Sequence, residues 1–282
     1  MSAPYPLVRN RYARSTRAGV SSRPSRVGSS PISASRFLIN SCIVLFYFLL
    51  SAAFHLHGRA QPPSPDALYA DRRNPESARR AADLWRAELA RDPRAFEAAW
   101  KLARARYWLG GHAAASEGRP LFEAGVDAGR KAAAIAPERP QGYFWMAANM
   151  GALAESYGLR QGIKYRKPIR EALETVLRLD PGFEQGSADR ALGRWYYKVP
   201  RLFGGSYPLA EQHLRESLKY NPHSTASHYF LAEMYLDEGR RSEAKTELQH
   251  VLEAPFDPDW EPENQEFKDR AQRLLSTPAI WN

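Results

Sequence analysis

The feature that most constrains the fold is a helical stripe of small and apolar residues that recurs along the chain. Four dipeptides ending in proline mark its copies: Asp92-Pro93, Ala136-Pro137, Asp180-Pro181 and Asn221-Pro222. Their prolines are 44, 44 and 41 residues apart, and Phe256 lies 34 residues after the last of them. Counting back 12, 8, 5 and 4 residues from each of the five points reaches positions that share one face of an α-helix. These positions are Ala81, Trp85, Glu88 and Leu89; Gly125, Gly129, Ala132 and Ala133; Ile169, Leu173, Val176 and Leu177; Ala210, Leu214, Ser217 and Leu218; and Ala244, Leu248, Val251 and Leu252.

A second helix is predicted before most of these stripes. At ten or twelve residues after each of the four prolines, a small residue follows a large one. The pairs are Leu102-Ala103, Met146-Ala147, Leu192-Gly193 and Leu231-Ala232. A small residue at this place lets the two helices of a hairpin approach closely, so we expect one antiparallel helix pair per copy.

This pattern resembles the tetratricopeptide repeat, and the last copy is the most similar. Its residues at the family spacing are Leu231, Ala232, Tyr235, Gly239, Ala244, Leu248 and Leu252. The resemblance implies an all-α fold, a right-handed α-solenoid of helical hairpins with a concave binding face. We expect four hairpins, a half-hairpin near residues 75–91 and a capping helix near residues 263–275. Asn74 is expected to cap the first helix, with Pro75 as its first residue.

The first three copies are longer than the last. The spacing from the small residue to the first residue of the next stripe is 22, 22 and 17 residues in these copies, against 12 in the last one. The extra residues all enter the connection between the two helices of a hairpin, and therefore lie at one edge of the solenoid. They either build a lip or binding surface there, or simply lengthen the helices.

The third insertion, residues 192–214, carries a closer resemblance. With the last copy and the segment DPDWEPENQEFKDRAQRLL, it resembles the T-component proteins of tripartite ATP-independent periplasmic transporters, over about residues 75–278. The segments WKLARARYWLG and YFWMAANMGAL are also similar to a related group, the regulators of microtubule dynamics. The T-component resemblance implies a protein that pairs with a periplasmic solute-binding protein.

The N-terminal region differs sharply in composition from the repeats. Residues 1–36 contain seven arginines and no acidic residue, within a net charge of +9 for the chain, and we expect a disordered tail. Residues 37–57 contain an uncharged apolar run that is just long enough to span a bilayer. They predict a single-pass anchor in the cytoplasmic membrane with its N-terminus inside, or a cleaved signal peptide and a periplasmic protein. Residues 58–74 would then be a linker, and residues 75–278 the solenoid.

Charge and cysteine content exclude several functions. Because seven of the nine excess charges lie in the tail, the repeats have no basic surface of the kind that nucleic acid requires. The single cysteine, Cys42, excludes an internal disulfide framework and a cysteine-based metal site. The sequence has no nucleophile elbow, phosphate-binding loop or zinc-protease motif. We therefore expect no enzyme, no cofactor and no metal site.

Aromatic pairs recur in each predicted first helix, and neighbouring residues on a helix point about 100° apart. One member of each pair could line a concave groove, while packing between hairpins is the alternative. The candidate binding residues are Trp145, Trp195, Tyr196, Tyr197, Arg201 and Phe203. The hypotheses for function are a scaffold for an importer's partner protein, a general adaptor for envelope assembly, or a carrier of an apolar small molecule. A homo-oligomer is also open.

Overall fold

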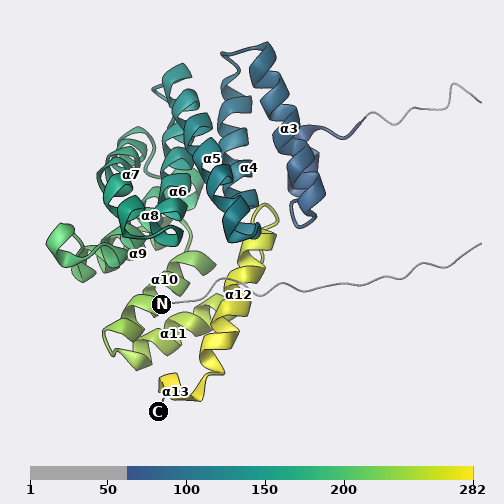
Figure 1. Cartoon of the computed structure of the whole chain (residues 1–282). Helices are drawn as coiled ribbons and strands as arrows, with labels where there is room; N and C mark the ends of the chain where they lie inside the picture. The colour runs from purple at the N-terminus through teal and green to yellow at the C-terminus, as the bar shows by residue number, and fades with distance from the viewer. Residues whose placement is uncertain (1–61, 282) are drawn as a thin grey trace, which may run out of the picture. The chain divides into compact units, whose positions relative to one another are not determined.

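The computed structural model describes residues 62–281, and every regular element in this range is a helix (Figure 1). The elements are α2 (Pro65–Ala70), α3 (Pro75–Arg91), α4 (Phe96–His112), α5 (Ala115–Ile135), α6 (Pro140–Ser156), α7 (Leu159–Leu179), α8 (Phe183–Lys198), the 3-10 turn η1 (Arg201–Phe203), α9 (Tyr207–Tyr220), α10 (Thr225–Asp237), α11 (Arg241–Glu253), α12 (Glu261–Leu275) and α13 (Pro278–Trp281). The predicted all-α class is confirmed.

The helices pair into the four predicted hairpins. These are α4 with α5, α6 with α7, α8 with α9, and α10 with α11, and the two helices of each hairpin are in extensive contact. α3 precedes them as the half-hairpin, and α12 follows them as the capping helix. The short helix α2 lies within the segment expected to be a linker, residues 58–74.

Local sequence sets the ends of these helices. The Asn74 side chain accepts a hydrogen bond from the backbone N–H of Glu76 at 3.1 Å, and Pro75 is the first residue of α3, as predicted. The residue before each recurring proline is a helix C-cap. These caps are Asp92, Ala136, Asp180 and Asn221. Proline disfavours helical backbone in the residue before it, and this explains why each copy stops there.

The extra residues of the longer copies form helix in the first two copies and a folded connection in the third. α4 and α6 have 17 residues each and α5 and α7 have 21 each, whereas α10 and α11 have 13 each. The first two insertions therefore lengthen helices. The third forms a connection that contains η1 and folds back on α8, where the Ser206 N–H donates to the Tyr196 carbonyl at 2.9 Å. A side chain on Gly205 would collide with the Val199 carbonyl, so this return path requires glycine.

The predicted stripes form the core. Trp85, Leu173, Leu214 and Leu248 are all buried, each from a different copy. One cluster of apolar side chains runs continuously from α2 to α8, and two smaller clusters join the last hairpin to α9 and α12. A repeat of this kind cannot bury its apolar face alone, so stacking of neighbouring hairpins supplies most of the stability.

The membrane location expected from the sequence is corrected by the structure. Across residues 62–281, no helix combines the length and apolar character that crossing a bilayer requires. We therefore withdraw the single-pass membrane location, together with the periplasmic location that depended on the same segment. Residues 1–36 and 37–57, on which the tail and anchor predictions rested, lie outside the described residues.

Candidate functional site

The first helices of the hairpins form a ring with α12. α4 contacts α6, α6 contacts α8, α8 contacts α10, and α10 contacts α12. α12 then returns to the end of α4, where His112 Nε2 lies 2.5 Å from Glu266 Oε1. α12 therefore links the last hairpin back to the first (Figure 1).

A buried arginine holds this closure. The guanidinium group of Arg72 donates to both carboxylate oxygens of Glu263, at 2.9 and 2.5 Å, and to the carbonyl of Asp259 at 2.6 Å. It lies over the rings of Tyr69 and Trp108, at 5.2 and 5.4 Å from their centroids. Arg72 is only 5% exposed, so this bidentate ion pair is shielded from water and salt. We call Arg72, Asp259 and Glu263 the clasp.

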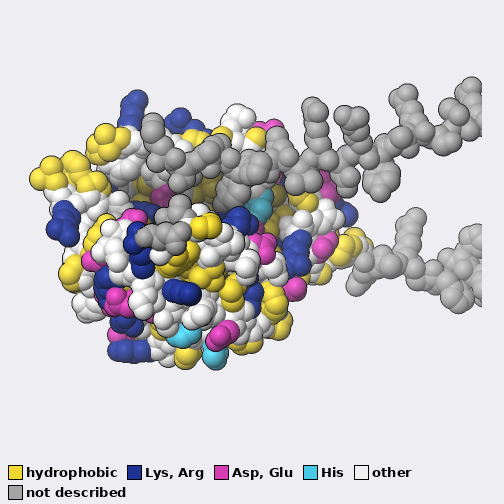
Figure 2. All heavy atoms as spheres, turned by 90° about the horizontal axis from the view of Figure 1, so that it is seen from below, with side chains coloured by type: hydrophobic (Ala, Val, Ile, Leu, Met, Phe, Trp, Pro, Cys, Tyr) yellow, Lys and Arg dark blue, Asp and Glu magenta, His cyan; other side chains and the backbone are white. Residues whose placement is uncertain are grey.

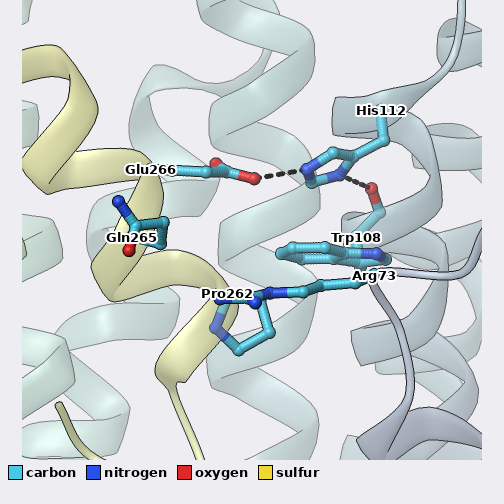
Figure 3. Close-up of a pocket in the computed structure, with 6 residues that line it drawn as sticks. All are labelled: Arg73, Trp108, His112, Pro262, Gln265 and Glu266. Atoms are coloured by element: carbon cyan, nitrogen blue, oxygen red, sulfur yellow. Dashed lines mark hydrogen bonds and ion pairs between the residues drawn. The ribbon is translucent and has the colours of Figure 1, made fainter.

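A narrow crevice lies beside the clasp, between α4 and α12 (Figure 3). Its volume is about 190 Å³, and Trp108, His112 and Glu266 face one another across it. Burial disfavours the charged imidazole, but hydrogen bonds to Glu266 and to the Trp108 carbonyl raise the pKa of His112 overall. The crevice is smaller than the pockets of about 300–1,000 Å³ that take drug-sized ligands. We therefore assign it to the closure of the ring.

A larger hollow opens between α3, α4 and α5. Its volume is about 600 Å³, within the range of ligand-binding clefts. Pro75, Leu109 and Leu121 supply apolar lining, and Arg79, Arg86 and Arg106 also line it. We call this hollow the α3–α5 groove. It lies at the edge where the first insertion lengthens α4 and α5, for which the sequence left a binding surface and longer helices as alternatives.

The arginines of the groove are incompletely paired. Arg86 contacts Asp83 at 3.0 Å, whereas no carboxylate within residues 62–281 forms an ion pair with Arg79 or Arg106. Burial, and then the neighbouring Arg86, lower the pKa of Arg106, although Asp83, which also lines the groove, acts in the opposite direction. An anion brought to this place would offset both effects, because it stabilises the charged guanidinium group. The groove is therefore suited to an acidic group next to an apolar one.

The ring interior is charged rather than apolar. From α8, Arg194 donates to both carboxylate oxygens of Glu155 at 2.8 Å and to Glu233 at 3.0 Å. These contacts join α6, α8 and α10, three members of the ring. Such a lining does not favour the hypothesis that the protein carries an apolar small molecule. An apolar ligand would remove water from these charged groups without forming polar contacts with them.

A strained segment also contributes to the interior. At the start of α8, Glu184, Gln185 and Gly186 have left-handed backbone, with φ of 42°, 59° and 74°. Residues other than glycine adopt this backbone conformation at a cost of about 1–3 kcal/mol each. The surrounding packing must offset this cost. Glu184 Oε2 is buried with no hydrogen-bond partner among the described residues. Burial raises the pKa of Glu184 to about 7, although Arg104 and Arg190 act in the opposite direction.

Comparison with known proteins identifies the family. Residues 65–278 match the family described as regulator of microtubule dynamics protein 1-3, which is well over half of the 282-residue chain. The chain belongs to this family. It is the group to which the segments around Trp108 and Trp145 are similar, whereas the T-component family is not shown by these comparisons.

The chain is also similar to several solved structures. The tetratricopeptide protein TTC0263 of Thermus thermophilus is 23% identical, with a TM-score of 0.57 over 75% of this chain and 97% of that one. MamA is 16% identical, with a TM-score of 0.44 over 71% and 95% of the two chains. Yeast Tom70 is 15% identical, with a TM-score of 0.19 over 73% and 61%. The first likeness supports the tetratricopeptide-like solenoid in this family member, and no curated protein sequence matches significantly.

The candidate residues from the sequence do not meet in one groove. Trp145 is buried, with its ring 5.9 Å from that of Tyr107. Trp195 is also buried and donates from Nε1 to the Arg166 carbonyl at 3.0 Å, and Tyr196 packs edge-on against it. These three side chains thus contribute to packing between neighbouring hairpins.

The other three candidates lie near the α8–α9 connection. The hydroxyl of Tyr197 donates to Asp237 Oδ2 at 2.5 Å and ties α8 to α10. Arg201 is exposed, with its guanidinium 5.6 Å from the ring centroid of Tyr207, and Phe203 is 41% exposed beside Arg166. Arg201 and Phe203 are the candidates of this set that remain open to a partner.

Sequence reasoning missed the clasp and the arginines of the groove. Arg72 precedes the first predicted helix, and Glu263 lies 191 residues later, so no local pattern connects them. Arg79 and Arg106 occupy polar positions of amphipathic helices and look like ordinary solvated arginines in the sequence. One feature of the sequence could have pointed to Arg106. No carboxylate lies three or four residues before or after it, so no residue of its own helix is placed to form an ion pair with it.

Proposed function

We propose that this protein is a non-enzymatic scaffold that binds a segment of a partner protein in the α3–α5 groove. The observation that carries the proposal is the presence of Arg79 and Arg106, both without an ion-pair partner among the described residues, beside the apolar side chains of Leu109 and Leu121. A segment that combines acidic and apolar residues would satisfy both features.

Charge distribution elsewhere supports a local site rather than a broad electrostatic surface. On the face drawn in Figure 2, basic and acidic side chains are interspersed and neither sign gathers in one large patch. A nucleic-acid partner would need a continuous basic stripe. The family and the solved structures reported above do not support the importer partner inferred from the T-component resemblance, so the partner is defined here by its chemistry.

The test is a peptide-binding measurement on the full chain. An array of ten-residue peptides would place two glutamates at every spacing among leucines and alanines, with glutamine-substituted copies as controls. We expect acidic peptides to bind and Arg106→Met or Arg79→Met to weaken binding by about tenfold, because a charge-assisted hydrogen bond is worth about 1.5–3 kcal/mol. Arg130→Met is the matched control, since Arg130 is an exposed α5 residue that does not line the groove. Equal binding by all three variants, or none by the wild type, would exclude the groove.

The family name suggests a second partner, because it refers to microtubule dynamics. Co-sedimentation with polymerised tubulin tests this directly. Binding that is lost in Arg106→Met would place microtubules at the α3–α5 groove, while binding that persists would assign them to another surface.

A further inference from the structure

The last hairpin carries a cluster of two histidines and a glutamate that the proposed function does not use. His228 is on α10, and Glu247 and His250 lie one turn apart on the same face of α11. One ligand atom from each residue lies within 4.8 Å of the other two. His228 and Glu247 are buried, whereas His250 is about half exposed, so the cluster opens to solvent on one side.

The hydrogen bonds of His228 leave a place for a cation. Its Nε2 lies 2.9 Å from the Pro222 carbonyl, and its Nδ1 lies 2.5 Å from Glu247 Oε2. Both ring nitrogens thus face oxygen acceptors, and a neutral imidazole can donate to only one of them. At 2.5 Å the Nδ1 and Oε2 atoms share a proton, and a metal ion that replaces this proton requires the two atoms to move apart.

The position of the third residue distinguishes these alternatives. A proton needs only His228 and Glu247, yet His250 Nδ1 also lies 3.9 Å from Glu247 Oε2, and the two imidazole rings are 4.9 Å apart. Ligands of a tetrahedral Zn²⁺ at 2.0–2.2 Å from the metal are about 3.3 Å from one another, and the observed 2.5 and 3.9 Å bracket this value. Side-chain movements of less than about 1 Å would bring both of these separations to this value.

The surroundings of His228 also match those of metal-bound histidines. Such a residue usually donates its second ring N–H to a carbonyl or carboxylate, which fixes the tautomer and the ring orientation. The Nε2 contact with the Pro222 carbonyl supplies this feature, and it leaves Nδ1 as the ligand atom. Two histidines and one carboxylate suit zinc and similar transition metals rather than Mg²⁺ or Ca²⁺, which prefer oxygen ligands alone.

We propose that His228, Glu247 and His250 bind a divalent transition-metal ion, with Zn²⁺ as the best chemical match. The ion crosslinks α10 to α11 and keeps a fourth coordination position open to solvent. This position takes water or a side chain from a second molecule. Because the site lies in the last hairpin and the α3–α5 groove lies in the first, the proposal is independent of the proposed function.

The test is calorimetric titration of ZnCl₂ into tag-free, chelator-treated full-length protein, followed by thermal melting. We expect one Zn²⁺ per chain, a higher Tm with metal, and no comparable binding of MgCl₂. His250→Gln should weaken Zn²⁺ binding at least about tenfold while the metal-free Tm stays close to that of the wild type, since His250 is exposed. Glu247→Gln should have a similar effect on Zn²⁺ binding.

A matched control separates this site from adventitious binding. His223 is exposed in the turn before α10 and lies outside the cluster, so His223→Gln should bind Zn²⁺ like the wild type. Absence of Zn²⁺ binding by the wild type would overturn the proposal and leave a buried hydrogen-bonded pair of His228 and Glu247. Equal affinity in His250→Gln and the wild type would overturn it as well.

Discussion

The first and last hairpins use one repeat pattern in two different ways. The stripe of α5 contains Gly125, Gly129 and Ala132, whereas the equivalent positions of α11 hold Ala244, Leu248 and Val251. A Cβ atom on Gly129 would lie 2.7 Å from the backbone nitrogen of Met146, so α5 and α6 approach backbone to backbone. In the last hairpin, by contrast, the side chain of Leu248 is completely buried and fills the same space.

This difference indicates that the repeat pattern fixes which face of a helix is buried but not how closely the helices approach. Small residues in α5 permit close contact with the long helix α6, and large residues in α11 require interdigitating side chains. The longer helices of the first hairpin also line the α3–α5 groove.

The first prediction exchanges the stripe residues. Gly129→Leu copies the last hairpin into the first and should lower the free energy of unfolding by about 3 kcal/mol or more, because the Met146 backbone occupies the space. Leu248→Ala should cost about 2–5 kcal/mol through the cavity it leaves. Urea denaturation followed by circular dichroism measures both. A Gly129→Leu protein as stable as the wild type would show that α5 and α6 are not in close contact.

The second prediction opens the ring. Arg72→Met leaves Glu263 without its buried partner and should lower the free energy of unfolding by about 3 kcal/mol. Amide hydrogen exchange should rise at the start of α12 more than in α6. Arg73→Met is the control, because its ion pair with Glu261 is about half exposed and should contribute less than about 1 kcal/mol. Equal effects of the two substitutions would contradict the role of the clasp.

The third prediction concerns the pH dependence of stability. Because burial raises the pKa of Glu184 to about 7, the folded protein binds this proton more tightly than the unfolded chain. The free energy of unfolding should therefore fall as pH rises from about 4.5 to 7, by at most about 3 kcal/mol from this group. Glu184→Gln should remove that part of the slope and be the more stable protein at pH 8. The measurement is the urea midpoint of each protein across this pH range, with Glu138→Gln, at an exposed glutamate, as control. If Glu184→Gln leaves the pH dependence of the midpoint unchanged, Glu184 is not the group responsible.

The smallest effect is expected from two glycines of α6. A Cβ on Gly151 meets nothing within 4 Å, so Gly151→Ala should raise the free energy of unfolding by about 0.5–1 kcal/mol through helix propensity alone. A Cβ on Gly142 would lie 2.4 Å from the Ala133 nitrogen, and Gly142→Ala should destabilise the protein instead. If both substitutions stabilised the protein, the close approach of α5 and α6 would be limited to the region around Gly129.

The sequence by itself determined the helices, their ends and their pairing. Asn74, the proline dipeptides and the 3.6-residue stripes act within a few residues of chain, so local reasoning located the four hairpins. It also indicated the edge at which the α3–α5 groove lies. It could not decide whether the insertions would form loops or helices, because both satisfy the same spacing.

Only the tertiary structure decided the closure of the ring and the arrangement of charged groups. The clasp joins Arg72 to Glu263 across 191 residues, and its formation depends on the small rotation between successive hairpins summed over the whole solenoid. The absence of an ion-pair partner for Arg106 among the described residues likewise depends on which helices pack around α4. Periodicity in a sequence reports which face of each helix is buried, whereas the partners of a charged side chain depend on where every other helix has been placed.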